Sequence, residues 1–197
     1  MKVRVEQGDI ARYGADALVV NLFEGVTAPG GGTGAVDAAL GGAISQVIAA
    51  GDLRGKSGEL VTIHTLGKIP APRVLVAGLG SREGFDIDAV RNLAANVARA
   101  LRRPGIKRAA TLAHGAGIGG LDPEACAQAI AEGAILGSYR FLKHKSASDE
   151  ERAELEELVI VEHDGVKVPA MQRAAERGSI LAEATNIARD WANEPSN

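Results

Sequence analysis

The chain has 197 residues, of which 46% are hydrophobic, 24% are charged and 3% are aromatic. This composition is typical of a folded globular protein and excludes a disordered or low-complexity chain, and the net charge of -3 disfavours nucleic acid as a partner. The single cysteine, Cys126, excludes an internal disulfide framework and a Cys-rich zinc site.

The first residues alternate polar and apolar side chains over 2–6, which predicts a strand with one buried face. They contain no apolar stretch of the length that a signal peptide needs. No apolar run in the chain approaches the roughly 20 residues of a membrane span. We therefore expect a cytoplasmic protein that makes no membrane contact.

The first half of the chain is expected to contain four strands and one helix. Apolar or alternating runs predict the strands, over residues 2–6, 15–23, 59–66 and 73–79. A glycine-rich loop over 29–34 follows the second strand. It leads into one helix that begins at Thr33 or Asp37 and ends at Ala50.

The second half is expected to alternate helices with strands. In chain order, the sequence predicts a helix over 87–103, a strand over 107–113, a helix over 123–141, a charged exposed stretch over 146–157, a strand over 158–162 and a helix over 169–192. Asp86 and Asp122 are suitable N-caps for the first two of these helices. A second glycine-rich loop occupies 114–120.

Strands that alternate with helices predict a three-layer α/β/α sandwich with a mixed, mostly parallel six-stranded sheet. The last helix is long and has a polar face. We therefore expect residues 1–168 to form one domain, and residues 169–197 to be a linker helix that leads to a further domain. The small and apolar residues of this helix lie in register at Met171, Ala174, Gly178, Leu181, Thr185 and Ala188.

The two glycine-rich loops each lie after a strand and before a helix. At such a place, backbone N–H groups converge on an anion, and the helix N-terminus adds a partial positive charge. Two loops of this kind at one sheet edge could hold a diphosphate. Alternatively, the glycines only make tight turns between strand and helix.

Other chemical motifs are weaker. Residues 50–57 nearly match a P-loop, but a helix precedes them and a strand follows, which is the reverse of a P-loop. They predict a helix end and a turn. The four histidines have no metal-ligand spacing, and we expect His64 to be packed within its strand. Cys126 is expected to be a small buried side chain. The residues therefore predict neither a metal site nor a catalytic group.

Two segments resemble a known family. They are Gly133-x-x-x-Gly137-Ser138-Tyr139-Arg140-Phe141-x-x-x-Lys145 and the terminal Ala188-Arg189-Asp190-Trp191-Ala192-Asn193-Glu194-Pro195-Ser196-Asn197. Together they are similar to the end of the N-terminal domain and the interdomain helix of the leucine aminopeptidase (cytosol aminopeptidase) family. Residues 66–68 and 74–80 also resemble the family's middle strands, and the similarity extends over essentially the whole chain.

The resemblance implies a role without catalysis. Members of the family are metal-dependent exopeptidases, usually hexameric, which use two divalent ions such as manganese or zinc. Their metal ligands and catalytic residues lie in a C-terminal domain, and no position of this chain matches them. The chain would be the N-terminal assembly or regulatory domain. Its partners would be its own catalytic domain, further copies in a hexamer, and peptide substrates that the catalytic domain binds.

This N-terminal domain shares its fold with macro domains. The segments that resemble the ligand site of that fold are residues 7–10, 16–21, 30–32 with 35–40, and 115–120. In macro domains, the acid that matches Asp9 hydrogen-bonds an adenine amino group, and glycine loops hold a diphosphate. The resemblance therefore implies an alternative function, the binding of ADP-ribose or a related nucleotide. The implied binding residues are Asp9, Asn21, Gly30, Gly31, Gly32, Gly115, Gly117 and Gly119.

One segment departs from the macro-domain pattern. Where that pattern has Asn-Ala-Ala-Asn, this chain has Asn21-Leu22-Phe23-Glu24. Glu24 thus places a carboxylate where a neutral amide helps to bind ribose. If Glu24 faces the site, we expect it to repel a diphosphate.

Overall fold

A computed structural model of the chain describes residues 1–144, 146 and 153–195. The strands are β1 (Lys2–Gln7), β2 (Ala17–Leu22), β3 (Leu60–His64), β4 (Arg73–Gly78), β5 (Arg108–Thr111) and β6 (Glu157–Glu162). The α-helices are α1 (Gly31–Ala39), α2 (Ala43–Ala49), α3 (Ile87–Arg102), α4 (Pro123–Ser138) and α6 (Val168–Asn193), and short 3-10 helices are η1 (Ile10–Arg12) and η2 (Gly117–Gly119).

The six strands form one sheet in the order β1-β6-β5-β2-β4-β3. Every neighbouring pair is parallel except β3–β4, which is antiparallel. Both the first and the last residue of each of the six strands lie within two residues of the predicted bounds. The predicted mixed, mostly parallel sheet is confirmed.

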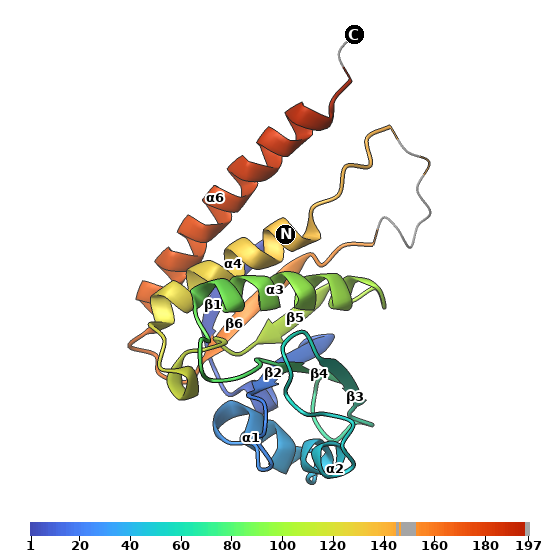
Figure 1. Cartoon of the computed structure of the whole chain (residues 1–197), viewed down its shortest axis with the longest axis vertical. Coiled ribbons are helices and arrows are strands. Elements are labelled where there is room, and N and C mark those ends of the chain that lie inside the picture. The colour runs from blue at the N-terminus through green and yellow to red at the C-terminus, as the bar shows by residue number, and fades with distance from the viewer. Residues whose placement is uncertain (145, 147–152, 196–197) are drawn as a thin grey trace.

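Helices cover both faces of the sheet and complete the predicted three layers (Figure 1). Helices α3, α4 and α6 pack on one face, and α1 and α2 lie on the other. Because successive side chains of a strand point to opposite faces, β2 contributes to both cores. Val19 belongs to the core under α3 and α4, whereas Leu18 and Val20 belong to the core under α1 and α2.

The single helix expected up to Ala50 is wrong, because the structure has two helices there. Gly41 and Gly42 have φ values of 69° and 83°, a left-handed conformation that ends α1 and favours glycine. Asp37, near the end of α1, then caps α2. One of its carboxylate oxygens accepts hydrogen bonds from the backbone N–H groups of Ile44 at 2.8 Å and Ser45 at 3.1 Å.

Replacing Asp37 with alanine is expected to lower the free energy of unfolding by about 1–2 kcal/mol, because two N–H groups at the start of α2 lose their acceptor. Urea denaturation followed by circular dichroism measures this loss. Asp52→Ala is the matched control: Asp52 is exposed just after α2, and its replacement is expected to change stability by less than about 0.5 kcal/mol. Equal losses in both variants would contradict the capping role.

Helix α4 packs closely against both neighbouring helices through glycines. A Cβ atom on Gly133 would lie 2.0 Å from the backbone oxygen of Arg91 in α3, and one on Gly137 would lie 2.6 Å from Ala95. On the other side, a Cβ atom on Gly178 of α6 would lie 2.5 Å from the backbone oxygen of Gln128 in α4. The two glycines of the family-like segment therefore set the distance between α3 and α4.

Two other expectations are corrected, and a third falls partly outside the described residues. Helix α4 ends at Ser138 and not at Phe141. His64 is exposed, because β3 is an edge strand that pairs only with β4; the histidine that is buried is His114. Of the charged stretch expected over 146–157, residues 147–152 lie outside the described residues.

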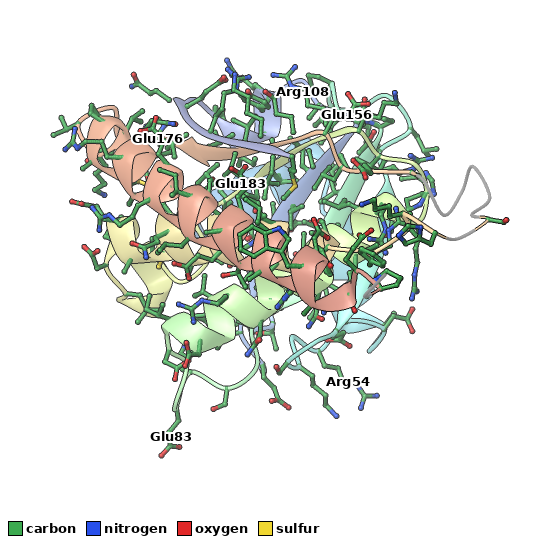
Figure 2. All side chains as sticks on the ribbon, turned by 90° about the horizontal axis from the view of Figure 1, so that it is seen from above. Arg54, Glu83, Arg108, Glu156, Glu176 and Glu183 are labelled. Atoms are coloured by element: carbon green, nitrogen blue, oxygen red, sulfur yellow. The ribbon has the colours of Figure 1, made fainter. Side chains whose placement is uncertain are left out.

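The register of α6 is correct only in its first half. Met171, Ala174 and Gly178 are buried as predicted, whereas Leu181 is 50% exposed. Thr185 and Ala188 are exposed as well. The cause is visible in Figure 1, where the C-terminal half of α6 extends past the sheet and α3. Figure 2 shows α6 lying outermost and carrying exposed side chains such as Glu176 and Glu183.

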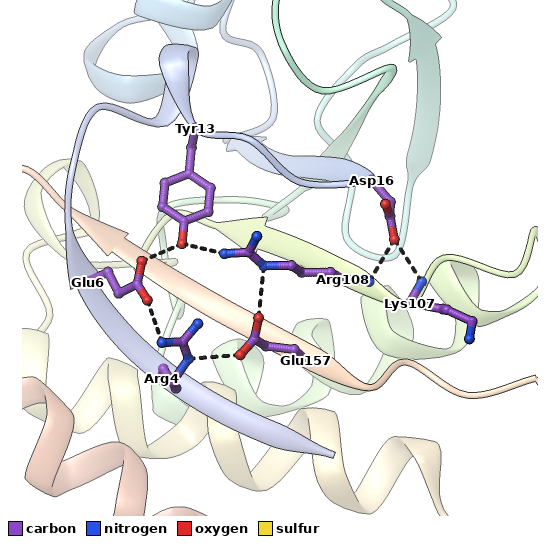
Figure 3. A network of polar contacts seen from close by, with 7 residues as sticks. All are labelled: Arg4, Glu6, Tyr13, Asp16, Lys107, Arg108 and Glu157. Atoms are coloured by element: carbon purple, nitrogen blue, oxygen red, sulfur yellow. Dashed lines mark hydrogen bonds and ion pairs between the residues drawn. The ribbon is translucent and has the colours of Figure 1, made fainter.

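Charged side chains form a network over β1, β5 and β6, on the side of the sheet opposite α3 and α4 (Figure 3). Glu157 lies at its centre. The Nε atom of Arg4 donates to Glu157 at 2.8 Å, and Nε of Arg108 lies 2.8 Å from the other carboxylate oxygen. Glu6 extends the network by accepting from Arg4 and from the hydroxyl of Tyr13. The network joins three strands.

Candidate functional site

A cavity of about 880 Å³ lies at the carboxyl ends of the five parallel strands. Each of these strands contributes residues at or just after its end, namely Gly8 and Asp9, Leu22 and Phe23, Leu79, Leu112 and Ala113, and Glu162 and His163. Ligand pockets in proteins measure about 300–1,000 Å³. Ligands of open α/β sheets bind outside the carboxyl ends of strands, where the chain direction across the sheet reverses. Here that reversal lies between β2 and β5.

The structure brings all eight residues of the predicted ligand site to this one cavity. Asp9, Asn21, Gly30, Gly31, Gly32, Gly115, Gly117 and Gly119 all line it. Both glycine-rich loops therefore lie at the same sheet edge, as predicted from their places between strand and helix.

The first glycine loop overlaps the start of α1, which begins at Gly31 and not at Thr33 or Asp37 as predicted. Gly30 is the N-cap and has no side chain to satisfy the first N–H groups of the helix. Gly31 has a positive φ of 55°. A Cβ atom on Gly32 would lie 2.6 Å from the Leu112 side chain. A larger residue at position 32 would thus displace the Leu112 side chain, while the N–H groups at the start of α1 face no capping side chain from Gly30.

The second glycine loop owes its glycines mainly to backbone conformation. Gly115 and Gly117 have φ values of 85° and 73°, in the left-handed region. A Cβ atom on Gly117 would contact nothing within 4 Å, whereas one on Gly115 would lie 2.9 Å from Leu121 and Phe85. The loop therefore presents backbone, and not side chains, at Gly117.

Asp9 has a structural contact as well as a place on the cavity wall. Its Oδ1 accepts a hydrogen bond from the backbone N–H of Ala11 at 3.0 Å and so caps η1. Its Oδ2 lies 3.6 Å from the Nε atom of Arg12. The side chain is 46% exposed. One carboxylate oxygen thus holds the local turn, and the carboxylate remains accessible.

Asn21 is held in place from two sides. Its backbone oxygen accepts from the Thr33 hydroxyl at 2.6 Å, which ties the end of β2 to α1. Its side-chain Nδ2 lies 2.8 Å from Nδ1 of His114. His114 is 1% exposed, and burial lowers its pKa to about 4, so the ring is neutral near pH 7.

His114 has a role that the sequence did not reveal. The spacing of the histidines drew attention to metal sites, and none was indicated. The available signal was its position as the first residue of the second glycine-rich loop, shortly after a buried strand. Its contact with Asn21 joins residues 93 positions apart, which no local pattern reports.

Glu24 does not face the cavity, which was the condition for its expected repulsion of a diphosphate. It is exposed, and it is absent from the described residues that line the cavity. The charged groups that do line it are Asp9, Arg82, Glu162 and Lys167. The expected repulsion of a diphosphate by Glu24 therefore does not arise from this structure.

The other chemical motifs have structural explanations. Ala50 ends α2, and β3 follows after a turn, so the near P-loop is the predicted helix end. Cys126 is buried, as predicted, and burial and Asp122 raise the pKa of its thiol to about 12. Among the described residues, no three His, Cys, Asp or Glu side chains are placed to hold a metal ion. None of the described helices is long and apolar enough to cross a membrane.

The two family-like segments contact each other at the far end of α6. The Tyr139 hydroxyl donates to Asp190 at 2.9 Å, and the Lys143 ammonium lies 2.9 Å from Glu194. Beside these contacts, α6 leaves apolar side chains exposed, namely Ile180, Leu181, Ile187 and Trp191.

Comparison with known proteins finds sequence relatives that carry the name of one family. Residues 19–148 match the family model described as the cytosol aminopeptidase family, N-terminal domain. The probable cytosol aminopeptidase of Alkaliphilus metalliredigens is 35% identical over 198 residues, which cover 100% of this chain and 39% of the relative. That of Aquifex aeolicus is 32% identical over 197 residues, covering 100% and 37%. The chain thus spans less than two fifths of the length of these relatives.

Solved structures share the fold. A mutant of tomato leucine aminopeptidase has a TM-score of 0.79 at 23% identity, with 99% of this chain and 38% of that chain covered. The bottromycin maturation enzyme BotP has a TM-score of 0.67 at 28% identity, covering 92% and 33%. The Trypanosoma brucei macrodomain in complex with ADP-ribose has a TM-score of 0.69 at 16% identity, covering 87% and 68%. The predicted macro-domain-like fold is confirmed.

Proposed function

Because the chain belongs to the cytosol aminopeptidase family as its N-terminal domain, we propose that it is the non-catalytic assembly or regulatory part of a metal-dependent leucyl aminopeptidase. The match of residues 19–148 to the N-terminal domain model carries this proposal. The whole enzyme would release N-terminal amino acids from peptides in the cytoplasm, as a homohexamer. This chain would brace the assembly and shape access to the active site.

We propose the domain division to be 1–168 for the macro-like domain and 169–197 for the helix that leads to the catalytic domain. Exposed apolar side chains on the outer half of α6 support this division, and Trp191 is 78% exposed. A catalytic domain that follows α6 would cover these side chains. The exposed area is therefore explained by an intramolecular partner.

The two divalent ions of the whole enzyme, manganese or zinc, would be held by the catalytic domain. The residues described here do not fit them, since they offer no cluster of His, Cys, Asp or Glu ligands. Peptide substrates would likewise meet the catalytic domain and not the cavity of this one.

The isolated chain is expected to release no p-nitroaniline from leucine p-nitroanilide in the presence of manganese, because the described residues include no cluster that could hold a metal ion to activate water. A longer protein that includes the following domain is expected to turn the same substrate over. The measurement is the absorbance of p-nitroaniline, with buffer as the blank. Turnover by the isolated chain would show that catalysis does not lie elsewhere.

A second function is favoured by the shared cavity. Asp9 follows β1 and Asn21 lies in β2, and the sheet order places β6 and β5 between these two strands, so the two residues lie toward opposite ends of the cavity. The glycine loops lie along the same cavity and present backbone N–H groups suited to an anion. We propose an elongated ligand with donor groups at both ends and an anionic centre, such as ADP-ribose or a related nucleotide.

Isothermal titration calorimetry with ADP-ribose tests this second function. Micromolar binding is expected, and Asp9→Asn is expected to weaken it about tenfold, or about 1.4 kcal/mol, by exchanging an acceptor for a donor. Asparagine keeps an oxygen for the Ala11 N–H, so η1 is retained. Glu24→Gln, outside the cavity, is the control and is expected to bind unchanged. No heat at millimolar ADP-ribose would exclude this function.

A further inference from the structure

The hydrogen positions around His114 follow from its heavy-atom contacts. The Thr111 hydroxyl donates to the backbone oxygen of Leu112 at 3.0 Å. A hydroxyl has one hydrogen. We assign it to this contact, which makes the Thr111 oxygen an acceptor toward His114; the opposite assignment would place the ring hydrogen on Nδ1. Nε2 of His114 lies 3.0 Å from that oxygen. The ring therefore carries its hydrogen on Nε2.

This arrangement fixes the role of the other ring nitrogen. The buried ring is neutral near pH 7, and a neutral imidazole has one N–H and one acceptor nitrogen. Nδ1 is consequently the acceptor. The atom of Asn21 that lies 2.8 Å from it must be the amide nitrogen, which donates.

We propose that His114 is a positioning residue that turns the amide of Asn21, so that the Asn21 carbonyl oxygen faces the cavity. This inference rests on the second proposed function, the binding of an elongated ligand. Asn21 lines the cavity, and the Thr33 hydroxyl holds its backbone from α1. With the backbone and one N–H of the amide engaged, the side-chain oxygen is the group of Asn21 left to accept a hydrogen bond from a ligand.

The orientation determines the chemical class of group that binds at Asn21. A carbonyl oxygen accepts hydrogen bonds from a hydroxyl or an amine, and it repels the oxygens of a phosphate or a carboxylate. The anionic part of the ligand must then lie at the glycine loops. The end of the ligand at Asn21 must carry a hydroxyl or amine donor, which the terminal ribose of ADP-ribose supplies and ADP lacks.

Nuclear magnetic resonance of the ligand-free chain tests the orientation directly. Long-range ¹H–¹⁵N correlation spectra of the histidine rings distinguish the Nε2–H and Nδ1–H tautomers and the charged ring. The signal of His114 is assigned by its loss in His114→Gln. We expect the Nε2–H tautomer from about pH 8 down to about pH 6, well above the ring pKa of about 4. An Nδ1–H tautomer or a charged ring near neutral pH would overturn the proposal.

Calorimetry with two probes tests the consequence for binding. His114→Leu is expected to weaken ADP-ribose about tenfold and to leave ADP within about twofold, because only the group at Asn21 loses its partner. In His114→Gln, one amide end can accept from Asn21 and the other can donate to Thr111, so we expect much of the ADP-ribose affinity to return. Equal losses for both probes, or no loss for ADP-ribose, would overturn the proposal.

The two proposals fail in different ways. If neither probe binds while the spectra show the Nε2–H tautomer, the ligand-binding function is wrong and the orientation of Asn21 stands. If both probes bind but the ring is the Nδ1–H tautomer, the function stands and the proposed role of His114 is wrong. If His114→Leu does not fold, the spectra of the unmodified chain and the binding of His114→Gln still decide the question.

Discussion

Gly133→Ala is expected to lower the free energy of unfolding by about 3 kcal/mol, the largest effect of any single methyl group considered for this chain. The added Cβ atom would lie 2.0 Å from the backbone oxygen of Arg91. A backbone atom in the middle of α3 cannot move aside as a flexible side chain can, so α3 and α4 must separate. Alanine favours a helix over glycine by about 1 kcal/mol, which offsets only part of the cost.

Urea denaturation of the isolated domain measures this change. Gly14→Ala is the control, because Gly14 is exposed, and a Cβ atom there would meet nothing within 4 Å. It is expected to be neutral or slightly stabilising, since alanine restricts the unfolded chain. A Gly133→Ala variant as stable as Gly14→Ala would show that the helices tolerate the methyl group and do not depend on this contact.

The strands were predictable because their signal is local. Buried runs such as 15–23 place apolar residues at successive positions, and each run ends at a glycine or a charged residue. The helix break at Gly41 and Gly42 was missed for a related reason. The apolar spacing of Val36, Leu40 and Ile44 continues across the break, so periodicity favoured one helix. The pair Gly41-Gly42 was visible in the sequence, but its positive φ values are known only from the structure.

Features that depend on the order of strands in the sheet could not be predicted. A strand pattern alone does not say whether the strand lies at the centre or at the edge, which is why His64 was misplaced. The outer half of α6 was misjudged similarly. Its small and apolar residues recur to Ala188, but the helix is longer than the body on which it packs.

The residues of the candidate site were predictable as a group, because Asn21 lies near the end of a strand and the others lie in segments that follow a strand or begin a helix. Carboxyl ends of parallel strands meet at one sheet edge, so the two glycine loops were expected to converge. The arrangement around Asn21 was not predictable. It depends on a buried contact between β2 and the first residue of the second glycine loop, and on the exclusion of water that keeps His114 neutral.

The cavity and the outer half of α6 are separate surfaces, for which we propose separate uses. The cavity lies at the carboxyl ends of the strands, whereas Trp191 lies near the end of α6. A ligand in the cavity and a catalytic domain on α6 can therefore be bound at the same time. Helix α4 packs against α6 and begins just after the second glycine loop. It is therefore the element that connects the cavity wall to α6.

Glu157→Gln is expected to lower the free energy of unfolding by about 2 kcal/mol near pH 7, because two arginines lose the carboxylate between them. Arg4 and Arg108 each lie 2.8 Å from a different oxygen of Glu157. The Glu157 side chain is 20% exposed, so water screens these contacts only in part. Figure 3 shows Glu157 in direct contact with both guanidinium groups, whereas Glu6 contacts Arg4 directly and Arg108 only through Tyr13.

The same variant is expected to show a defined pH dependence. Burial raises the pKa of Glu157, but the hydrogen bond and charge of Arg4, together with the charge of Arg108, outweigh it and lower the pKa below its usual value. A lowered folded-state pKa stabilises the fold above the unfolded pKa of about 4.3, and this stabilisation is lost as the pH falls through the folded pKa. The difference between the two proteins should therefore shrink in acid.

Urea denaturation at about pH 7 and at steps below about pH 4 measures both effects. Glu156→Gln is the matched control, since the neighbouring Glu156 pairs with Lys107 in a contact where both side chains are largely exposed. Such pairs contribute about 0–1 kcal/mol, so its stability is expected to differ little from that of the unmodified chain. A Glu157→Gln deficit that stays constant from neutral to acid pH would mean that the loss comes from packing and not from the charge of the carboxylate.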